Sequence, residues 1–232
     1  MRLGSKLRLA ALIALVLSFG LLTRAAAPAP DPKAEVLARL DVAAKNFHST
    51  SADVEFDTIE TDPIYDKDVL KGVVYYDREG SSFKMGAHFD RHYDKPSTRA
   101  YTYVGGVLRA RDSESAPVST YANAGKWESY VMLGFGASGK DLAAKWDITY
   151  LGSEPISDGK NIIKTDILEL VAKDPAVRKN LASVKIWVDP DRALSLKQIF
   201  TLNATTSKIC LYSNFKVNEK LPANAFTLDP IK

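Results

Sequence analysis

The sequence has a single cysteine, Cys210, so no disulfide bond can form within the chain. The stability of an exported protein without cross-links rests on burial of a core. Cys210 lies between Ile209 and Leu211, on what we expect to be the mainly polar face of a strand. A thiol nucleophile needs a nearby base, and a lone cysteine in a strand is usually a small packing residue. We therefore expect no catalytic role for Cys210.

Recognisable catalytic and nucleic-acid-binding patterns are also lacking. No serine lies in a nucleophile elbow, and no pair of carboxylates is set in a known motif. No stripe of Lys and Arg with interleaved aromatic residues runs along the chain. The sequence therefore predicts a protein that is not an enzyme, uses no cofactor and does not bind nucleic acid.

Two short patterns imitate ligand sites. His88 and His92 have the spacing of a helical zinc pair, but here they span a strand end and a turn, so we expect no metal site. The segment Gly134–Asp141 (GFGASGKD) resembles a phosphate loop, yet Asp141 stands where Ser or Thr would reach magnesium. Because no βαβ unit surrounds it, we interpret it as a flexible, glycine-rich segment rather than a nucleotide site.

The N-terminus has the pattern of a secretion signal. Arg2, Lys6 and Arg8 precede an apolar run over Leu9–Leu22, which is short for a membrane span, and small residues follow up to Ala27. We expect residues 1–27 to be a signal peptide and residues 28–232 to form one domain. The alternative is an uncleaved N-terminal anchor. No cysteine lies near the end of the leader, so it does not resemble a lipoprotein signal.

The positive charge of the chain comes from this leader. The whole sequence has 31 basic and 28 acidic residues, a net charge of +3. Removing the leader takes away Arg2, Lys6, Arg8 and Arg24, which leaves 27 basic residues and a net charge of −1. The basic character is therefore a targeting feature and does not indicate an acidic partner.

The rest of the sequence predicts an α+β protein that is mostly antiparallel β. A first helix is expected from Asp31, a good N-cap, and Pro32, with an apolar face that continues to Phe47. Period-two alternation predicts strands separated by turns. The expected strands are residues 54–60, 69–77, 82–89, 99–104, 107–111, 146–151 and 161–171, followed by a short helical piece over 174–182.

The C-terminal part predicts a meander of three strands with one face away from water. The residues expected on that apolar face are Val184, Ile186, Val188, Leu194, Leu196, Phe200, Leu202, Ile209, Leu211, Phe215 and Val217. A sheet of this kind needs a cover for its apolar face. One candidate is an apolar helix over residues 126–134, with Trp127, Val131 and Phe135 on one stripe and Met132 beside it. Two interpretations stay open for it: a movable lid, or a helix packed permanently on the sheet.

Several motifs along the mature chain carry a resemblance. They are Gly72–Arg78 with Phe83 after it, Tyr101–Gly106, Ile186–Asp189, Lys197–Phe200, Ser213–Asn218 and Leu221–Phe226. In these motifs and in element order the chain resembles the periplasmic carriers of outer-membrane lipoproteins, the LolA-like family. The resemblance implies an unclosed, curved β-barrel of about nine to eleven strands, with a long N-terminal helix and a short helical lid.

The resemblance also implies a function. A member of this family carries the acyl chains of lipoproteins through the periplasm, between an inner-membrane release complex and an outer-membrane acceptor, and it acts as a monomer. The acyl-binding residues would be Phe83, Met85, Phe89, Trp127, Val131, Met132 and Phe135. Arg78 is the position that matches the family's lid latch. The same fold also allows an envelope lipid sensor or a protein-binding adaptor, and both alternatives stay open.

Overall fold

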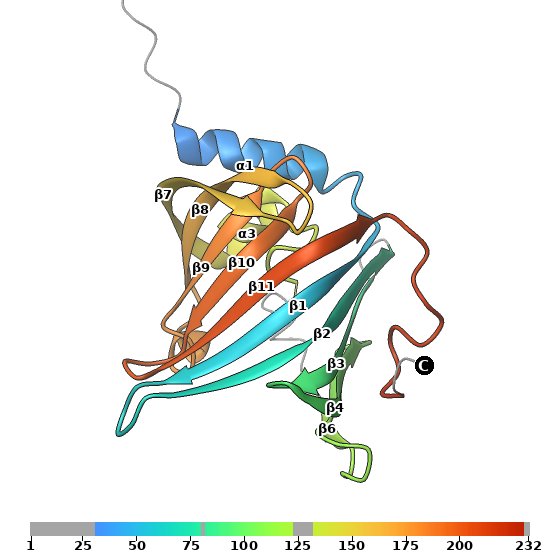
Figure 1. The fold of residues 1–232 in the computed structure, drawn as a ribbon. Helices are drawn as coiled ribbons and strands as arrows, with labels where there is room; N and C mark the ends of the chain where they lie inside the picture. The colour runs from blue at the N-terminus through green and yellow to red at the C-terminus, as the bar shows by residue number, and fades with distance from the viewer. Residues whose placement is uncertain (1–30, 80–81, 123–131, 230–232) are drawn as a thin grey trace, which may run out of the picture.

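The structure, a computed structural model, describes residues 31–79, 82–122 and 132–229. In this part of the chain, eleven strands form a single sheet in the order β6-β5-β4-β3-β2-β1-β11-β10-β9-β8-β7. Every pairing between neighbouring strands is antiparallel. Figure 1 shows the strands crossing the molecule side by side, with α1 lying across one end.

The strands are β1 Ser49–Glu60, β2 Asp66–Glu79, β3 Ser82–His92, β4 Lys95–Val104, β5 Val107–Arg111, β6 Ser119–Tyr121, β7 Trp146–Ser157, β8 Ile162–Ala172, β9 Ser183–Asp189, β10 Leu194–Thr201 and β11 Thr206–Val217. The helices are α1 Pro32–Ala43, α3 Gly139–Lys145 and α4 Pro175–Arg178. The strands β6 and β7 are the two edges and do not pair with each other in the described residues, so the barrel is unclosed. The predicted antiparallel, unclosed sheet is confirmed.

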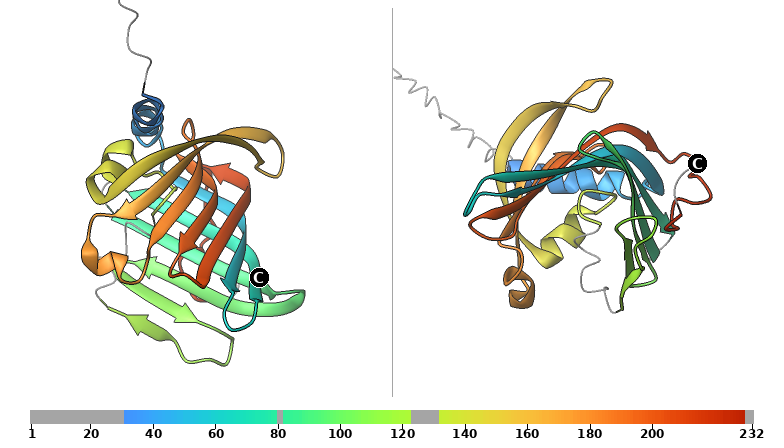
Figure 2. Two further views of the ribbon diagram at one scale, coloured as in Figure 1. Left: turned by 90° about the vertical axis from the view of Figure 1, so that its left-hand side faces the viewer. Right: turned by 60° about the horizontal axis from the view of Figure 1, so that its bottom comes forward.

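The two faces of the sheet differ. We call inner the face that carries the buried apolar side chains, and outer the opposite face. Figure 2 shows the sheet bent around the inner face, with α3 and the chain that leads into it on that side. The inner face holds two hydrophobic clusters. One lies beneath α1 and α3, and the other, which we call the inner cluster, spans β1 to β4 and β11. The curvature therefore wraps most of the sheet around these two clusters.

Helix α1 begins as expected and ends early. The side chain of Asp31 accepts a hydrogen bond from the Lys33 backbone N–H at 3.1 Å, and Pro32 occupies the first turn. Val36 and Leu40 are buried against the core. The helix ends at Ala43 after 12 residues, so a long N-terminal helix is not confirmed. No helix of the described residues is long and apolar enough to cross a bilayer.

The expected orientation of β11 is wrong in its first half. Cys210 and Tyr212 face the inner cluster, whereas Leu211 is 39% exposed on the outer face. The reason is an irregularity at Asn214, whose φ is +54°, next to a register shift between β1 and β11. An extra residue in a strand reverses the facing of all residues beyond it. Phe215 and Val217 therefore do reach the inner cluster, as expected, while Ile209 and Leu211 do not belong to it.

A second register shift lies between Ser195 and Lys197 in β10. Beyond it, Gln198 is only 2% exposed and lies beside inner residues of β9 and β11, because it pairs with Ile186 and Cys210. A polar residue thus lies at the boundary between the two hydrophobic clusters of the inner face. Alternation over Leu194, Leu196 and Phe200 already assigns position 198 to this face, but it does not explain why the residue there is polar.

The region before β7 also differs from the prediction. Ser138 caps α3 by accepting a hydrogen bond from the Asp141 N–H at 3.1 Å, and this helix and β6 were not expected. The residues just before it are buried, with Leu133 at 1% and Phe135 at 0% exposure, so the interpretation as a flexible segment is wrong. The described residues contain no group of three or more His, Cys, Asp or Glu that could hold a metal ion.

The chain after β11 covers part of the outer face. Ala225 is fully buried there, and its carbonyl lies 3.4 Å from Nε2 of His88 on β3. A Cβ atom at Gly86 would lie 1.8 Å from the same carbonyl, so only glycine admits this close approach. Tyr75 packs edge-on against the His88 ring. Outer side chains of β2 and β3 are therefore buried without belonging to the inner core.

The bulge at Asn214 predicts a selective effect on stability. Asn214→Val should lower the free energy of unfolding by about 1–2 kcal/mol more than Asn214→Gly, because a β-branched residue is strained at positive φ. Both variants lose the hydrogen bond from Nδ2 to Asp53, which is 2.7 Å long, so their difference isolates the backbone. Urea unfolding monitored by circular dichroism measures both values. Equal stabilities for the two variants would contradict the bulge.

Candidate functional site

An aromatic side chain from a loop fills the centre of the inner face. Phe135 is completely buried, stacked on the ring of Tyr76 with centroids 3.8 Å apart and planes 12° apart. It meets the ring of Tyr212 edge-on at 5.0 Å. Tyr76 comes from β2 and Tyr212 from β11, on opposite sides of β1. The loop therefore places one ring between two strands that are not neighbours in the sheet.

We call residues Met132–Ala137 the inner loop. Two backbone hydrogen bonds join the middle of this loop to the start of β10. The carbonyl of Gly134 accepts from the Ser195 N–H at 2.7 Å, and the N–H of Gly136 donates to the Ala193 carbonyl at 2.9 Å. These bonds place Phe135 opposite Leu194 of β10 as an isolated bridge. The loop thus pairs with the sheet over a very short stretch.

Two side chains of the sheet hold carbonyls of the inner loop. Nη1 of Arg78, at the end of β2, donates to the Gly136 carbonyl at 2.7 Å. Nε2 of Gln198, on β10, donates to the Leu133 carbonyl. The loop is therefore attached by polar contacts around an apolar ring, and no covalent link is involved.

The shape of the inner loop depends on two glycines. Gly134 has a φ of +79°, and a Cβ there would lie 2.4 Å from Cβ of Ser195. Gly136 has a φ of +69°, and a Cβ there would lie 2.2 Å from the ring of Phe47. Only glycine adopts this backbone at so little cost and leaves room for these neighbours. Two of the glycines that imitate a phosphate loop in the sequence therefore allow the loop backbone to pack closely against Ser195 and Phe47.

The structure brings five of the expected acyl-binding residues into one cluster. Phe83, Phe89 and Phe135 are buried in it, and Met85 and Met132 are partly buried against it. Trp127 and Val131 lie outside the described residues. Acyl binding by these side chains stays a prediction, as does the role of Arg78 as a latch.

Sequence reasoning missed several residues of this inner cluster. Tyr76, Tyr212, Cys210 and Phe56 all line it, and Gln198 lies at its edge. Cys210 and Tyr212 were missed because the bulge at Asn214 was not expected. The sequence does carry one signal of this bulge. Asn tolerates positive φ, so an Asn within an apolar strand marks a possible irregularity.

The polar groups of the inner cluster stay uncharged. Burial raises the pKa of Tyr76 and of Tyr212 above the ordinary range. Burial likewise raises the pKa of the Cys210 thiol to about 12. The hydroxyl and thiol groups therefore stay protonated at neutral pH and can act as hydrogen-bond partners. A surface of this kind is suited to binding an apolar ligand and offers no activated nucleophile.

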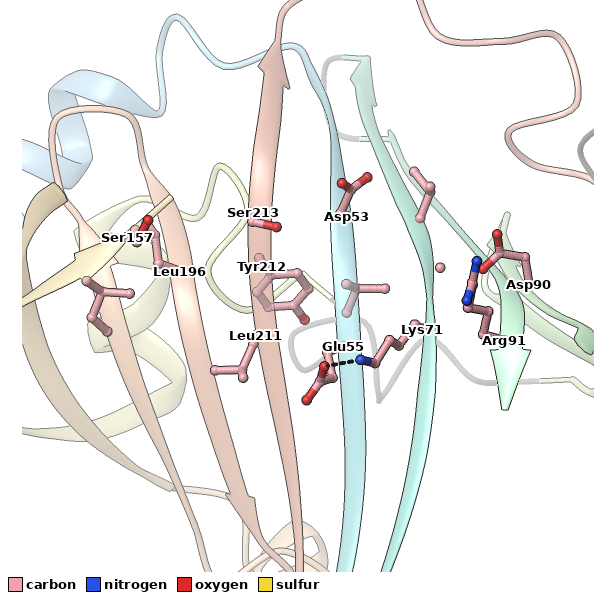
Figure 3. A pocket seen from close by; sticks show the side chains of 14 residues that line it. Asp53, Glu55, Lys71, Asp90, Arg91, Ser157, Leu196, Leu211, Tyr212 and Ser213 are labelled. Carbon is pink, nitrogen blue, oxygen red and sulfur yellow. Dashed lines mark ion pairs between the residues drawn. The ribbon is translucent and has the colours of Figure 1, made fainter. Parts of the chain in front are cut away.

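A hollow lies on the outer face of the sheet. It has a volume of about 660 Å³ and lies between the end of β7, with Ile156, and the outer side chains of β11, β1 and β2. Figure 3 shows Asp53, Glu55 and Lys71 along it, with Lys71 Nζ 3.0 Å from a Glu55 carboxylate oxygen. A further hollow of about 760 Å³ shares Asp53 with it and extends toward the chain after β11. Both hollows are lined by charged and apolar residues together.

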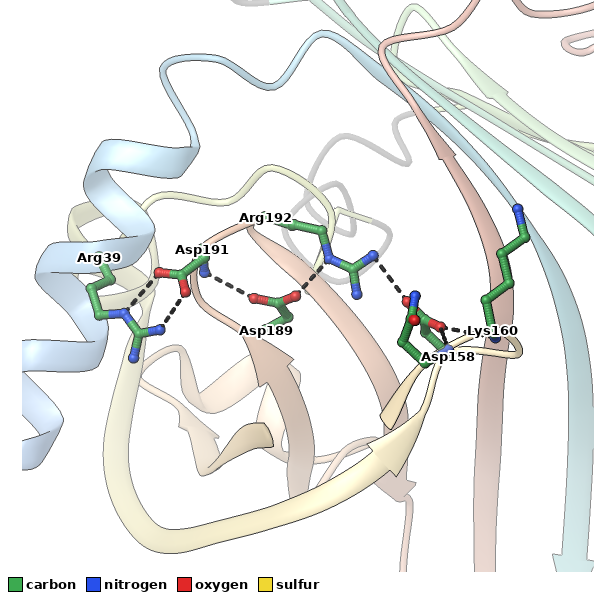
Figure 4. A network of polar contacts seen from close by, with 7 residues as sticks. Arg39, Asp158, Lys160, Asp189, Asp191 and Arg192 are labelled. Atoms are coloured by element: carbon green, nitrogen blue, oxygen red, sulfur yellow. Dashed lines mark hydrogen bonds and ion pairs between the residues drawn. The ribbon is translucent and has the colours of Figure 1, made fainter. Parts of the chain in front are cut away.

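A polar network holds the β7–β8 hairpin over the outer face (Figure 4). Arg192 joins Asp158, at the hairpin tip, to Asp189 at 3.2 Å and 2.6 Å, and Arg39 of α1 pairs with Asp191 at 2.7 Å. Burial alone would raise the pKa of Asp158, but backbone N–H donors and Arg192 lower it below the usual range. The Asp158 carboxylate therefore stays ionised at neutral pH, and the network fixes the frame around the inner face.

The burial of Cys210 predicts its reactivity. The thiol is 4% exposed and its pKa is raised to about 12, so iodoacetamide at pH 8 should label the folded protein far more slowly than the urea-unfolded chain. Mass spectrometry of timed samples measures both rates. Equal rates in the two states would show that Cys210 faces solvent, as the simple alternation of β11 predicts.

The chain was compared with known proteins. No family model matches it, and no curated protein matches it. Among solved structures, it is similar to a DUF1329 family protein from Desulfovibrio piger, at 14% identity over 84% of this chain and 95% of that one, with a TM-score of 0.45. The LolA superfamily protein NE2245 from Nitrosomonas europaea gives 16% identity over 84% and 97%, with a TM-score of 0.40.

LprF from Mycobacterium bovis gives 14% identity over 83% of this chain and 97% of that one, with a TM-score of 0.44. These values describe a distant likeness of fold. They do not show what the protein does.

Proposed function

We propose that the protein is a non-enzymatic periplasmic carrier that shelters the acyl chains of lipoproteins against its inner face and transfers them toward the outer membrane. The observation that supports this most is the place of Phe135. A loop, and not a strand of the sheet, supplies the ring at the centre of the inner face. Withdrawal of the inner loop would open an aromatic and aliphatic surface without unpairing any two neighbouring strands.

The lining of that surface suits an acyl chain. The rings of Phe83, Phe89, Tyr76 and Tyr212 and the side chain of Met85 surround the place of Phe135 or adjoin it. Each CH₂ group moved from water to such a surface contributes about 0.8 kcal/mol. A long acyl chain would gain on the order of 10 kcal/mol in gross terms if it were fully sheltered.

A carrier must also release its cargo, and the inner loop offers a means. In the empty protein, Phe135 and the hydrogen bonds of the loop occupy the surface that the chain would take. A bound lipid has to replace these contacts, so its net binding energy is smaller than the gross gain. Arg78 acts as the latch in this proposal, because its charged guanidinium holds the Gly136 carbonyl at 2.7 Å.

Other features of the sequence agree with this role. The predicted signal peptide over residues 1–27 would direct the chain out of the cytoplasm, and the resemblance to lipoprotein carriers implies the periplasm. The partners would be a release complex in the inner membrane and an acceptor at the outer membrane, with the carrier itself monomeric. We expect no cofactor and no metal in the cycle.

One observation favours a second candidate, a protein-binding adaptor or a lipid sensor with the same fold. The outer hollow of about 660 Å³ exposes Leu211 of β11 beside charged side chains of β1 and β2, which is a surface that a protein could use. An adaptor would bind its partner with the inner loop in place.

Mixing the purified mature protein with lipoprotein-loaded membranes separates these functions. A carrier should release lipoprotein into solution as a one-to-one complex, which gel filtration detects. A sensor should bind free lipid but leave lipoprotein in the membrane, and an adaptor should do neither. Failure to release any lipoprotein, or to bind free lipid, would contradict the carrier.

The latch predicts that Arg78→Ala binds a fluorescent acyl probe, cis-parinaric acid, about tenfold more tightly than the wild type. The reason is that a hydrogen bond from a charged donor stabilises the closed state by about 1.5–3 kcal/mol, and the probe no longer has to break it. Fluorescence titration measures both affinities. Arg109→Ala, on the exposed side of β5, is the matched control and should leave the affinity unchanged. Unchanged or weaker binding by a folded Arg78→Ala protein would contradict the latch.

A further inference from the structure

A polar side chain lies beside the inner cluster, although a protein that bound only hydrocarbon would need no polar group there. Gln198 is 2% exposed, on β10, at the edge of the inner cluster. Its position between Ile186 and Cys210 in the sheet would suit an aliphatic residue. A buried amide without a partner is costly, so its presence has to be explained by what it binds.

Both ends of the Gln198 amide have partners. Its Nε2 donates to the carbonyl of Leu133 in the inner loop, and its Oε1 accepts from the Tyr212 hydroxyl at 3.1 Å. A carbonyl oxygen only accepts, so the amide must present its NH₂ end to the loop. The Tyr212 hydroxyl stays protonated and holds the other end in this orientation. The inner cluster therefore has a fixed N–H donor whose partner is a carbonyl of the loop.

The loop imitates the chemical layout of an acyl group. Leu133 presents a carbonyl to Gln198, and two residues later Phe135 places hydrocarbon against Tyr212. Tyr212 touches both, because its ring meets Phe135 and its hydroxyl meets the amide of Gln198. A carbonyl with a hydrocarbon chain attached would match these neighbouring sites in the same order.

On this basis we propose that Gln198 donates a hydrogen bond to a carbonyl oxygen of the bound lipid once the inner loop is displaced. The proposal rests on the proposed carrier function and names the ligand class: acyl lipids, whose chains carry an ester or amide carbonyl, in preference to alkyl chains of equal length. When the loop leaves, Nε2 loses the Leu133 carbonyl, and a ligand without a carbonyl leaves this buried donor unpaired. A ligand with one restores the bond.

A matched pair of probes tests this directly. The probes are 1-palmitoyl lysophosphatidylcholine and its 1-O-hexadecyl ether analogue, which share headgroup and chain length but differ in one carbonyl. Isothermal titration calorimetry below the critical micelle concentration measures both affinities. The wild type should bind the ester about tenfold more tightly than the ether, a difference of about 1.4 kcal/mol. This measurement needs no variant to fold.

Two variants separate carbonyl recognition from attachment of the loop. Gln198→Leu removes the donor. This variant should still bind both probes, but with about equal affinity for the ester and the ether. Arg78→Ala also frees the loop but keeps the donor, so both affinities should rise together and the tenfold preference should remain. Circular dichroism confirms that each variant is folded.

The outcomes distinguish the two proposals. Equal affinity of the wild type for ester and ether would overturn the role of Gln198 and leave the carrier function standing. An ester preference that persists in folded Gln198→Leu protein would also overturn it. Failure of both probes to bind the wild type would overturn the carrier function itself, and the ligand class with it.

Discussion

The packing of Phe135 against Tyr76 and Tyr212 is the contact on which the interior depends. An unclosed sheet leaves its inner face without the opposite wall that a closed barrel supplies, so the apolar side chains need another cover. Here α1 and α3 cover the side of β7 to β10, and the inner loop covers the centre. Phe135 is completely buried and touches strands on both sides of β1. The cover at this point is a single ring on a short loop.

The polar contacts of the inner loop match this arrangement. Arg78 and Gln198 hold loop carbonyls from β2 and β10, while the backbone bonds to Ala193 and Ser195 set the register. Each of these bonds has a donor or acceptor that a ligand or water could replace, whereas the strand ladders around them do not need to change. The sheet is thus a fixed frame, reinforced on the outer face by the network of Arg192 and Arg39, and the loop is the part that can exchange.

The sequence predicts the sheet better than it predicts the site. Alternation places nearly every strand, and Phe83, Met85 and Phe89 do share the inner face. Alternation fails at the bulge of β11, because one extra residue reverses the facing of Cys210 and Tyr212. The conformation of the inner loop cannot be predicted from the neighbouring sequence, where its glycines imitate a phosphate loop. It depends on contacts with β2, β10 and β11, which are distant in the sequence and enclose Phe135.

Hydrogen exchange at the inner loop tests most directly whether Phe135 gives way to lipid. The amides of Gly136 and Ser195 join the loop to the sheet, and the amides between β1 and β2 serve as an internal reference. Saturation with palmitoyl lysophosphatidylcholine should speed exchange at Gly136 and Ser195 and leave the β1–β2 amides unchanged. Bound lipid with unchanged or slower exchange at both residues would contradict displacement of the loop.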